Sequence, residues 1–380
     1  MIEGKFNPIE LLENKRKLLL EFGSRLSESQ RIKVLNDPHA KRSPRWCGMT
    51  IHVTINCPFG CVYCYIEDMG FKFGNPKPYP LSGAELVYAL LNNKYFLPGK
   101  FGTLIAVGSV SEPFIFPNKA LEYLENLAEL GNPIQFSTKQ YISSSLAEKI
   151  ANISKEKGAP INPLVTIITL SKANTLEKYA PSPEKRLDSI KNLRDAGLKP
   201  VLFLRPVIPG INDREILDVL KAAKDAGAYG VVIGGFRVTM KILNRLKEAG
   251  LDVFEIVRRM KIIDNKQRLV PFPEKKRIIE QSRKIGLIPW ASTCCANAWN
   301  ANVPCPSVCF IDGKCTRCPN ACHFLRDSPD ENLVMEALKR LGIKAKIRNK
   351  FVLIDKSEER QIEFLVRTIS RRGVKFVKLR

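Results

Sequence analysis

Hydrophobic and polar positions alternate along residues 50–290 in a way that predicts parallel strands joined by helices. Six short runs rich in Val, Ile and Leu are typical of strands that are covered on both faces. The segments between them have apolar residues at helical spacing and begin with caps, such as Ser82 followed by Glu85. The predicted strands are 50–56, 103–108, 134–138, 164–170, 200–205 and 230–235.

Six such βα units predict an α/β fold, and we expect a partial (β/α)6 barrel rather than the closed eight-stranded form. An open doubly wound sheet would give much the same local pattern, so the alternation alone does not separate the two. In both folds the chemistry lies at the carboxyl ends of the parallel strands. We therefore expect the functional residues in the segments that follow the predicted strands.

The flanking segments break this alternation and divide the chain into four predicted parts. Residues 1–46 form a leading segment and residues 47–290 form the barrel. Residues 291–323 are rich in Cys, Asn and Pro and show little periodicity, which predicts a Cys-rich metal-binding module. Residues 324–380 predict a small α/β domain that carries 15 basic and 8 acidic residues.

The composition is that of a globular protein, with 44% hydrophobic and 26% charged residues in a chain of 380. No apolar run reaches the roughly 20 residues that span a membrane, and the N-terminus has no apolar signal core, so we expect a cytoplasmic protein. The net charge of +23 favours a polyanionic partner. A Lys-rich thermophilic surface is the alternative, although such surfaces usually raise Glu together with Lys.

Ten of the 11 cysteines fall into two groups rather than being scattered as core thiols would be, and Cys47 stands apart from both. The first group is Cys57, Cys61 and Cys64, directly after the first predicted strand. Clustered thiols in a long intracellular chain bind metal more often than they form disulfides. A cubane iron–sulfur cluster has four irons, so three thiolates leave one corner open, as in catalytic rather than structural metal sites.

This motif, Cys57-x3-Cys61-x2-Cys64 with an aromatic Tyr63, resembles that of the radical S-adenosylmethionine (SAM) superfamily. The resemblance implies that the three thiolates hold a 4Fe–4S cluster whose fourth iron binds SAM. It also implies reductive cleavage of SAM to a 5′-deoxyadenosyl radical that abstracts hydrogen from a substrate. An electron donor such as ferredoxin or flavodoxin would then be a partner. A zinc loop or buried thiols are the alternatives for this motif.

Residues 45–240 are more closely similar to the spore photoproduct lyase-like branch, a group that resembles DNA repair photolyases. Tyr65, in the segment Cys-Tyr-Ile, matches a tyrosine that lies near SAM and relays hydrogen. Ser111, in GSVSEPF, and Lys139, in STKQ, match residues that contact SAM, and a lysine ammonium suits the SAM carboxylate. An ungapped reading back from Tyr-Ala-Pro at 179–181 places Thr169 at another SAM-binding position.

Three further positions are open to more than one interpretation. Glu112 either positions ribose hydroxyls or is an ordinary loop acid. Arg205 either meets an anionic substrate or SAM, or forms a structural salt bridge. The lyase of this branch has a hydrogen-donating Cys where this chain has Ser109, and a hydroxyl is a far poorer hydrogen donor. Cys294 or Cys295 are candidates for the missing thiol.

The second group of cysteines lies between residues 294 and 323 in sequence rich in loop-forming residues. Its close spacings are typical of metal ligands, and a second iron–sulfur cluster or a zinc ion is the prediction. The candidate ligands are Cys309, Cys315, Cys318 and Cys322, with Cys305 as a substitute. Cys47 and His52 have the pattern of buried structural residues, and His39 has no evident partner.

Charge and resemblance together favour a nucleic-acid substrate, either DNA under repair or RNA being modified. Radical modification of a protein, a peptide or a small metabolite is a second hypothesis, since auxiliary clusters are common in such enzymes. A metal-bearing nucleic-acid-binding protein without catalysis is a third, and the intact motif residues argue against it. The oligomeric state is not predicted.

Overall fold

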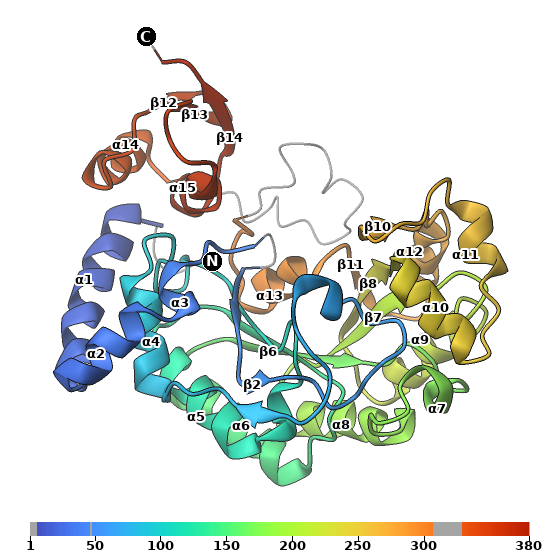
Figure 1. Cartoon of the computed structure of the whole chain (residues 1–380). Helices are drawn as coiled ribbons and strands as arrows, with labels where there is room; N and C mark the ends of the chain where they lie inside the picture. The colour runs from blue at the N-terminus through green and yellow to red at the C-terminus, as the bar shows by residue number, and fades with distance from the viewer. Residues whose placement is uncertain (1–5, 46–47, 307–328, 380) are drawn as a thin grey trace.

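A curved sheet of seven parallel strands organises the computed structural model, which describes residues 6–45, 48–306 and 329–379 (Figure 1). The strands follow one another in chain order across the sheet, each paired in parallel with the next. In the described residues the two edge strands do not pair, so the barrel is open. The order is β1 (Met49–Ile51), β4 (Ile105–Val107), β5 (Ile134–Thr138), β6 (Ile161–Thr166), β7 (Val201–Val207), β8 (Gly230–Gly235) and β11 (Ile288–Trp290).

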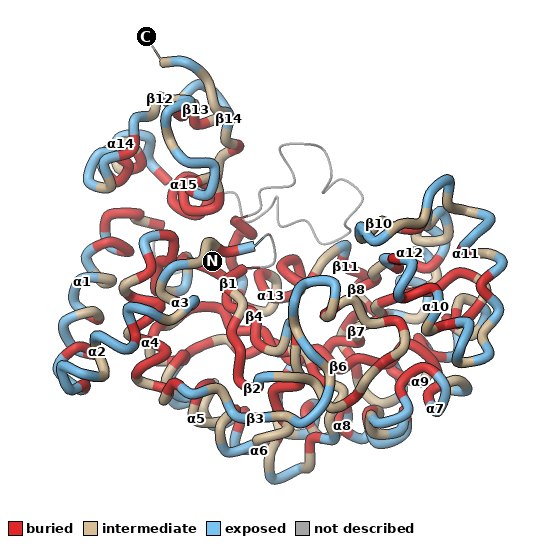
Figure 2. The backbone as a smooth tube through the Cα atoms, viewed as in Figure 1, coloured by how far each residue is buried: buried red, intermediate tan, exposed pale blue. Residues whose placement is uncertain are grey.

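Helices cover the convex face of this sheet, and the main hydrophobic core lies between the two layers (Figure 2). The capping box predicted at Ser82 is present: the Ser82 hydroxyl accepts from the Glu85 amide at 3.2 Å, and the Glu85 carboxylate accepts from the Ser82 amide at 2.7 Å. The outer helices are α4 (Gly83–Asn92), α5 (Pro117–Ala128), α6 (Ser144–Glu156), α8 (Pro183–Asp195), α9 (Ile216–Asp225) and α12 (Lys275–Lys284).

The concave face of the sheet is filled by α13 (Thr293–Asn300). The Asn297 amide donates to the backbone carbonyls of Ile105 and Pro133, both at 3.3 Å, which ties the helix to the starts of β4 and β5. The Gln135 amide donates to the Thr293 carbonyl at 3.0 Å. A second apolar cluster between α13 and the inner faces of the strands includes the fully buried Trp290.

Smaller elements flank the sheet at both ends. In the N-terminal segment α1, α2 and α3 pack beside α4. Past β8, two short helices and a two-stranded ribbon extend from the sheet. The bounds are α1 (Pro8–Ser24), α2 (Glu28–Leu35), α3 (Pro38–Lys41), β2 (Thr54–Ile55), β3 (Lys77–Pro78), α7 (Ala173–Leu176), β9 (Arg237–Val238), α10 (Met240–Glu248), α11 (Phe254–Arg259) and β10 (Arg268–Leu269).

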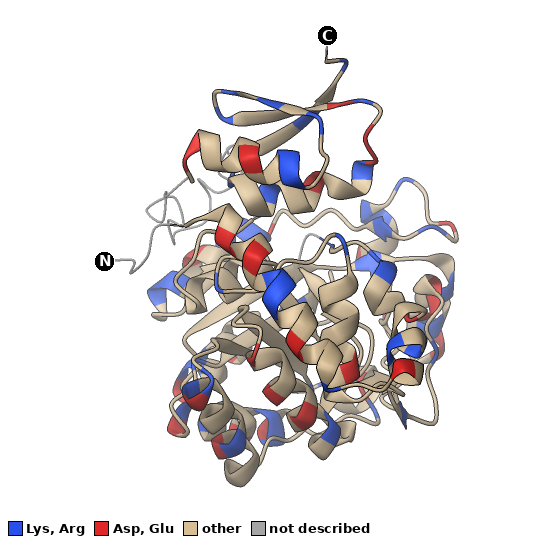
Figure 3. Ribbon diagram, turned by 90° about the vertical axis from the view of Figure 1, so that its left-hand side faces the viewer, with Lys and Arg blue, Asp and Glu red and all other residues tan. Residues whose placement is uncertain are grey.

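The C-terminal residues 329–379 form a small α/β unit that packs against α1 through its own hydrophobic cluster. Its three strands pair in the order β12–β13–β14, the first pair antiparallel and the second parallel. Lys and Arg lie on both its sheet and its helices (Figure 3). Its elements are α14 (Glu331–Arg340), β12 (Ala345–Arg348), β13 (Phe351–Asp355), α15 (Glu363–Ser370) and β14 (Gly373–Val377).

The predicted α/β class and open barrel are confirmed, with three differences in the strands. The predicted strand 164–170 is β6, which begins at Ile161 and ends at Thr166. A seventh strand, β11, was missed because it is only Ile-Pro-Trp, and its proline has no amide hydrogen for a ladder bond. The predicted strand 50–56 is interrupted after Ile51, and its second part pairs with β3 instead of the sheet. The boundaries of the four predicted parts stay a prediction. No helix in the described part of the chain is long and apolar enough to cross a membrane.

Candidate active site

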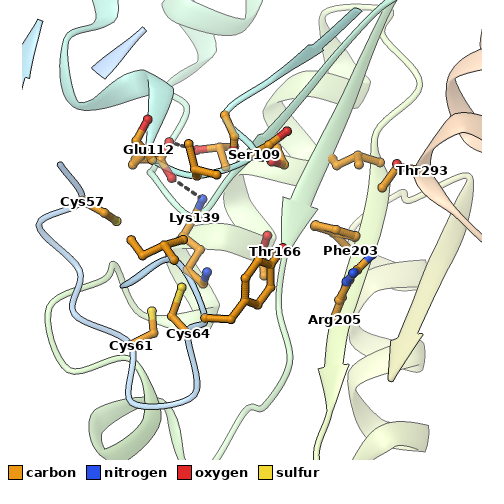
Figure 4. Close-up of a pocket in the computed structure, with 18 of the residues that line it drawn as sticks. Cys57, Cys61, Cys64, Ser109, Glu112, Lys139, Thr166, Phe203, Arg205 and Thr293 are labelled. Carbon is orange, nitrogen blue, oxygen red and sulfur yellow. Dashed lines mark hydrogen bonds between the residues drawn. The ribbon is translucent and has the colours of Figure 1, made fainter. Parts of the chain in front are cut away.

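A cavity of about 280 Å³ opens at the carboxyl ends of the strands, where the sequence predicts the chemistry (Figure 4). Its walls come from the segment after β2 and from the ends of β4, β5, β6, β7 and β8. Segments far apart in the sequence therefore meet around one space. Ten of the predicted site residues line it: Cys57, Cys61, Tyr63, Cys64, Tyr65, Ser109, Ser111, Glu112, Lys139 and Arg205.

The loop that carries Cys57, Cys61 and Cys64 is held by backbone hydrogen bonds rather than by regular structure. The Cys57 amide donates to the Lys72 carbonyl at 3.0 Å, and the Cys64 amide donates to the Cys61 carbonyl at 3.0 Å. Burial raises the pKa of Cys57 to about 11 and that of Cys61 to about 12. The thiolate forms therefore need nearby positive charge, which a bound metal supplies.

Arg245, on α10, binds this loop through its guanidinium and was not predicted from the sequence. Its guanidinium donates to the Cys64 carbonyl and, at 3.2 Å, to the Glu67 carboxylate. It also lies over the Phe73 ring, 5.5 Å from the ring centre. Arg245 therefore fixes the backbone at the third cysteine, although it is 181 residues away in sequence.

The loop after β4 is tightly built around Gly108 and Glu112. Gly108 has a φ of +80°, and a Cβ there would stand 2.7 Å from the Ser137 carbonyl oxygen. The Glu112 carboxylate accepts from the Thr138 hydroxyl at 2.6 Å and from the Lys139 amide at 2.9 Å. Burial raises the pKa of Glu112, and these donors oppose that shift. Glu112 therefore connects the loop after β4 to the end of β5.

Ser111 lies in the same loop and differs from Glu112 in having no partner. Its hydroxyl oxygen is buried, lines the cavity and makes no hydrogen bond within the described residues. A buried hydroxyl without a partner costs free energy unless a ligand or water satisfies it. Ser111 is therefore available to a molecule bound in the cavity.

Lys139, at the end of β5, points toward the cysteine loop (Figure 4). Its ammonium nitrogen lies 3.8 Å from a carboxylate oxygen of Glu177 and 5.7 Å from the centre of the Tyr63 ring. Burial lowers the pKa of Lys139, but the adjacent Cys61 and Glu177 raise it by more, so its net pKa is above the usual value. Lys139 is a fixed positive charge beside the thiols.

Glu177 joins several parts of the site and was not predicted. Its carboxylate accepts from the Tyr63 hydroxyl and, at 2.5 Å, from the guanidinium of Arg186 on α8. Glu177 and Arg186 have fully buried side chains. Arg186 also donates to the carbonyls of Thr166 and Pro181, at 3.1 and 2.7 Å. The pair thus connects the cysteine loop to the strand ends.

Other predicted residues have different positions. Thr169 does not line the cavity, because its hydroxyl donates to Glu215; Thr166, three residues earlier, lines it instead. Tyr65 lines the cavity and its hydroxyl has no partner among the described residues, and the exposed Ser109 lies at the same cavity. Arg205 lies on the side of the cavity away from the cysteines (Figure 4).

The structure describes only three cysteines of the second group, Cys294, Cys295 and Cys305. Cys309, Cys315, Cys318 and Cys322 lie outside the described residues, as does Cys47. Cys305 is buried in the same apolar cluster as Cys294 and Cys295, beside α13. In the segments that the structure describes, no three His, Cys, Asp or Glu side chains are gathered as a site for a single metal ion. The second metal site stays a prediction.

The two buried histidines lie together outside the cavity. The His39 Nδ1 lies 2.7 Å from the Asp37 carboxylate, a partner two residues away that the sequence analysis overlooked. His52 contacts the Arg42 guanidinium, and its ring centre is 5.4 Å from that of His39. The expectation that His52 is a buried structural residue is confirmed by its exposed fraction of 9%.

Comparison with known proteins identifies the part of the chain that forms this site. Residues 51–223 match the family model of the Radical SAM superfamily. The chain contains a radical SAM domain. This stretch includes the cysteine loop, the Ser111 loop and Lys139, and it extends through the fifth strand of the sheet into α9.

Two curated relatives are themselves uncharacterized proteins. The chain is 28% identical over 172 residues to protein MJ0683 of Methanocaldococcus jannaschii, covering 44% of this chain and 63% of that protein. It is 23% identical over 219 residues to protein Rv2578c of Mycobacterium tuberculosis, covering 54% of this chain and 64% of that protein. The matches thus span less than two thirds of either relative.

Among solved structures, mutants of spore photoproduct lyase have the same fold. One aligns with a TM-score of 0.51 and 16% identity over 64% of this chain and 75% of its own. Another, with bound AdoMet and dinucleoside spore photoproduct, aligns with a TM-score of 0.50 and 14% identity over 66% of this chain and 76% of its own. At this identity the likeness is one of fold.

The residues around the cavity fit the cluster and SAM that the family implies. Three thiols from one loop line a space of about 280 Å³, which is far larger than a single ion requires. The buried, unpartnered hydroxyl of Ser111 and the ammonium of Lys139 line the same space. A three-thiol donor set suits an iron–sulfur cluster, and the polar groups suit the charged end of SAM.

Proposed function

We propose that this protein is a radical SAM enzyme that abstracts hydrogen from a nucleic-acid substrate, in DNA repair or RNA modification. When bound, a 4Fe–4S cluster and SAM supply reductive cleavage of SAM to a 5′-deoxyadenosyl radical. One observation carries the proposal: a single cavity is lined by Cys57, Cys61 and Cys64 and by the buried Ser111 hydroxyl, which has no partner among the described residues.

The residues of the chain have distinct roles in this proposal. The three cysteines hold the cluster, and Lys139 binds the SAM carboxylate beside them as a fixed point charge. Ser111 hydrogen-bonds SAM in this proposal, because its buried hydroxyl has no partner among the described residues. Tyr65, which lines the cavity and whose hydroxyl has no partner among the described residues, relays hydrogen in this proposal.

Ser109 lies at the same wall, but its O–H bond is a poor hydrogen-atom donor. The chain therefore needs another donor, or it leaves the substrate radical to a later step. Cys294 and Cys295 are buried residues of α13 itself, and the preceding residue Thr293 lines the cavity, which keeps the two thiols as candidates.

A nucleic-acid substrate is supported by charge and by fold. The net charge is +23, and residues 329–379 carry 13 basic and 7 acidic side chains. Neutralising phosphates releases counter-ions, so binding should weaken steeply as salt rises. A similar solved structure carries a dinucleoside spore photoproduct. Ferredoxin or flavodoxin is the proposed electron donor, and a second cluster or zinc ion at Cys305–Cys322 stays part of the proposal.

The chemistry is tested by anaerobic reconstitution with iron and sulfide, reduction, addition of SAM and measurement of 5′-deoxyadenosine. We expect wild-type protein to form it and Cys61→Ala to form none. Lys139→Gln and Ser111→Ala should raise the KM for SAM while the iron content of the protein is kept. Ser145→Ala, on the exposed start of α6, is the matched control for serine removal.

Two results would contradict the proposal. One is zinc instead of iron at the first cysteine group, and the other is iron without SAM cleavage, which would favour a metal-bearing binding protein. The substrate is tested by adding DNA, tRNA or peptide and measuring which one increases 5′-deoxyadenosine formation. Stimulation by peptide alone would favour the protein-modifying alternative.

A further inference from the structure

Arg205 is a cation inside the cavity that has no partner in the described part of the chain. Its side chain makes no hydrogen bond or ion pair within the described residues, although it is only partly exposed. The fold makes room for it: a Cβ at Gly234, on the adjacent strand β8, would stand 2.5 Å from Arg205 Cγ and Cδ. Only glycine at 234 allows the stem of Arg205 to lie in this position.

Two further arginines line the same cavity and are also unpaired. The side chains of Arg45, before β1, and Arg237, on β9, have no partner in the part of the chain that the structure describes. Glu112 is the only acidic residue among the lining residues, and its carboxylate is used by the Thr138 hydroxyl and two backbone amides. The cavity therefore carries an excess of positive charge that the described residues do not neutralise.

SAM does not account for this charge. SAM has one carboxylate, and Lys139 beside the cysteines is the proposed cation for it. Figure 4 places Arg205 and Phe203 across the cavity from the cysteines, with Thr166 between the two sides. A second anionic group on the Arg205 side must therefore belong to another molecule.

We propose that Arg205 forms an anion subsite that receives phosphate groups of the substrate on the side of the cavity opposite the cluster, and that Arg45 and Arg237, which line the same cavity, add positive charge to it. A guanidinium presents a planar fork of donors that matches two phosphate oxygens. Phe203, on the same strand as Arg205, borders the subsite with an aromatic ring, which suits a nucleotide more than an acidic side chain. This subsite deepens the proposed function and rests on it.

The test compares three probes on reconstituted, SAM-bound protein by isothermal titration calorimetry. The probes are hexathymidylate, its uncharged methylphosphonate analogue and hexaglutamate. We expect wild-type protein to prefer hexathymidylate, and Arg205→Gln to weaken that binding by about 10- to 100-fold, as expected for a charge-assisted bidentate contact. Arg205→Lys should fall between the two, because it keeps the charge and loses the fork.

The matched control is Arg16→Gln, which removes one charge from an exposed, unpaired arginine on α1 far from the cavity lining. It should change hexathymidylate binding less than twofold. The methylphosphonate analogue should bind equally to wild type and Arg205→Gln, because it lacks the negative charge that the Arg205 guanidinium binds. If Arg205→Gln does not fold, Arg237→Gln provides the same comparison with a smaller expected loss.

Three outcomes would overturn the subsite: equal hexathymidylate binding by wild type and Arg205→Gln, equal losses for the charged and uncharged probes, or preference for hexaglutamate. Loss of SAM binding in Arg205→Gln would indicate that Arg205 binds the cofactor, and this result would also overturn the proposed subsite. Formation of 5′-deoxyadenosine by wild-type protein without any probe tests the proposed function separately. The two failures are therefore distinguishable.

Discussion

The buried pair of Glu177 and Arg186 gives the sharpest prediction for stability. Glu177 is the single acidic partner of Arg186 among the described residues, at 2.5 Å, and both side chains are fully buried. Glu177→Gln keeps the shape of the side chain and removes its charge. The Arg186 and Lys139 charges then lose their common carboxylate in a site with little water.

Breaking a buried ion pair by neutralising one member typically costs about 3–5 kcal/mol, because the other charge is left uncompensated. Arg186 keeps its two carbonyl acceptors in Glu177→Gln, so we expect the lower end, about 3 kcal/mol. Urea denaturation of the metal-free, reduced protein, followed by tryptophan fluorescence, measures the loss of unfolding free energy.

The matched control is Glu336→Gln, which neutralises the carboxylate of an exposed ion pair with Arg340 on α14. Exposed pairs contribute little, so its urea midpoint should stay at the wild-type value. A double mutant, Glu177→Gln with Arg186→Met, should lose less than the sum of the single changes, because it leaves no unpaired guanidinium. Coincident midpoints for Glu177→Gln and Glu336→Gln would refute the reasoning.

Three other predictions follow from the same structure. Gly108→Ala should lower the thermal midpoint of unfolding and the affinity for SAM. Residue 108 has a φ of +80°, and the new Cβ would stand 2.7 Å from the Ser137 carbonyl oxygen. An unchanged midpoint would contradict the close packing of this loop. Burial, with nearby Arg42, lowers the pKa of His52 to about 3. As pH falls, the unfolded chain therefore binds a proton at His52 before the folded chain does. The free energy of unfolding should keep its full value above about pH 6.5 and fall toward pH 3, by at most about 1.4 kcal/mol per pH unit for this group. Urea midpoints of wild type and His52→Gln measured against pH check this, and parallel curves would contradict it. Cys57→Ala should remove about four irons per chain, measured by colorimetric iron analysis after reconstitution; an unchanged iron content would place the iron elsewhere.

Local sequence signals predicted the barrel because its strands are apolar and several of its helices, namely α4, α6 and α8, have side-chain caps from neighbouring residues. The Ser82–Glu85 capping box is a contact over three residues, so the sequence contains the whole of it. The same is true of the three cysteines, whose spacing within one loop needs no knowledge of the fold. The seventh strand has only three residues and takes its conformation from pairing with β8, so no local pattern could reveal it.

The groups that were missed depend on contacts between distant segments. Glu177 is 114 residues from Tyr63, and Arg245 is 181 residues from Cys64. Each has the sequence appearance of an ordinary surface charge on a helix or in a loop. Thr169 shows the opposite error: the ungapped reading back from residues 179–181 selected a threonine that lies three residues past the end of β6. Its hydroxyl donates to Glu215, whereas Thr166, the last residue of the strand, lines the cavity.

The charges around the cavity can be ordered by what the protein does with each of them. Glu177 sits between Arg186, which it pairs directly, and Lys139, which it holds at 3.8 Å. That distance is long for an ion pair, so Lys139 is positioned but keeps donors for another carboxylate. Among the described residues Arg205 has no such partner and no such restraint. Arg186 has one carboxylate and two carbonyl acceptors, although its Nη2 atom has no partner in the described residues. Lys139 has one distant carboxylate and Arg205 has none, so the positive charge left for a ligand increases from Arg186 toward the substrate side of the cavity.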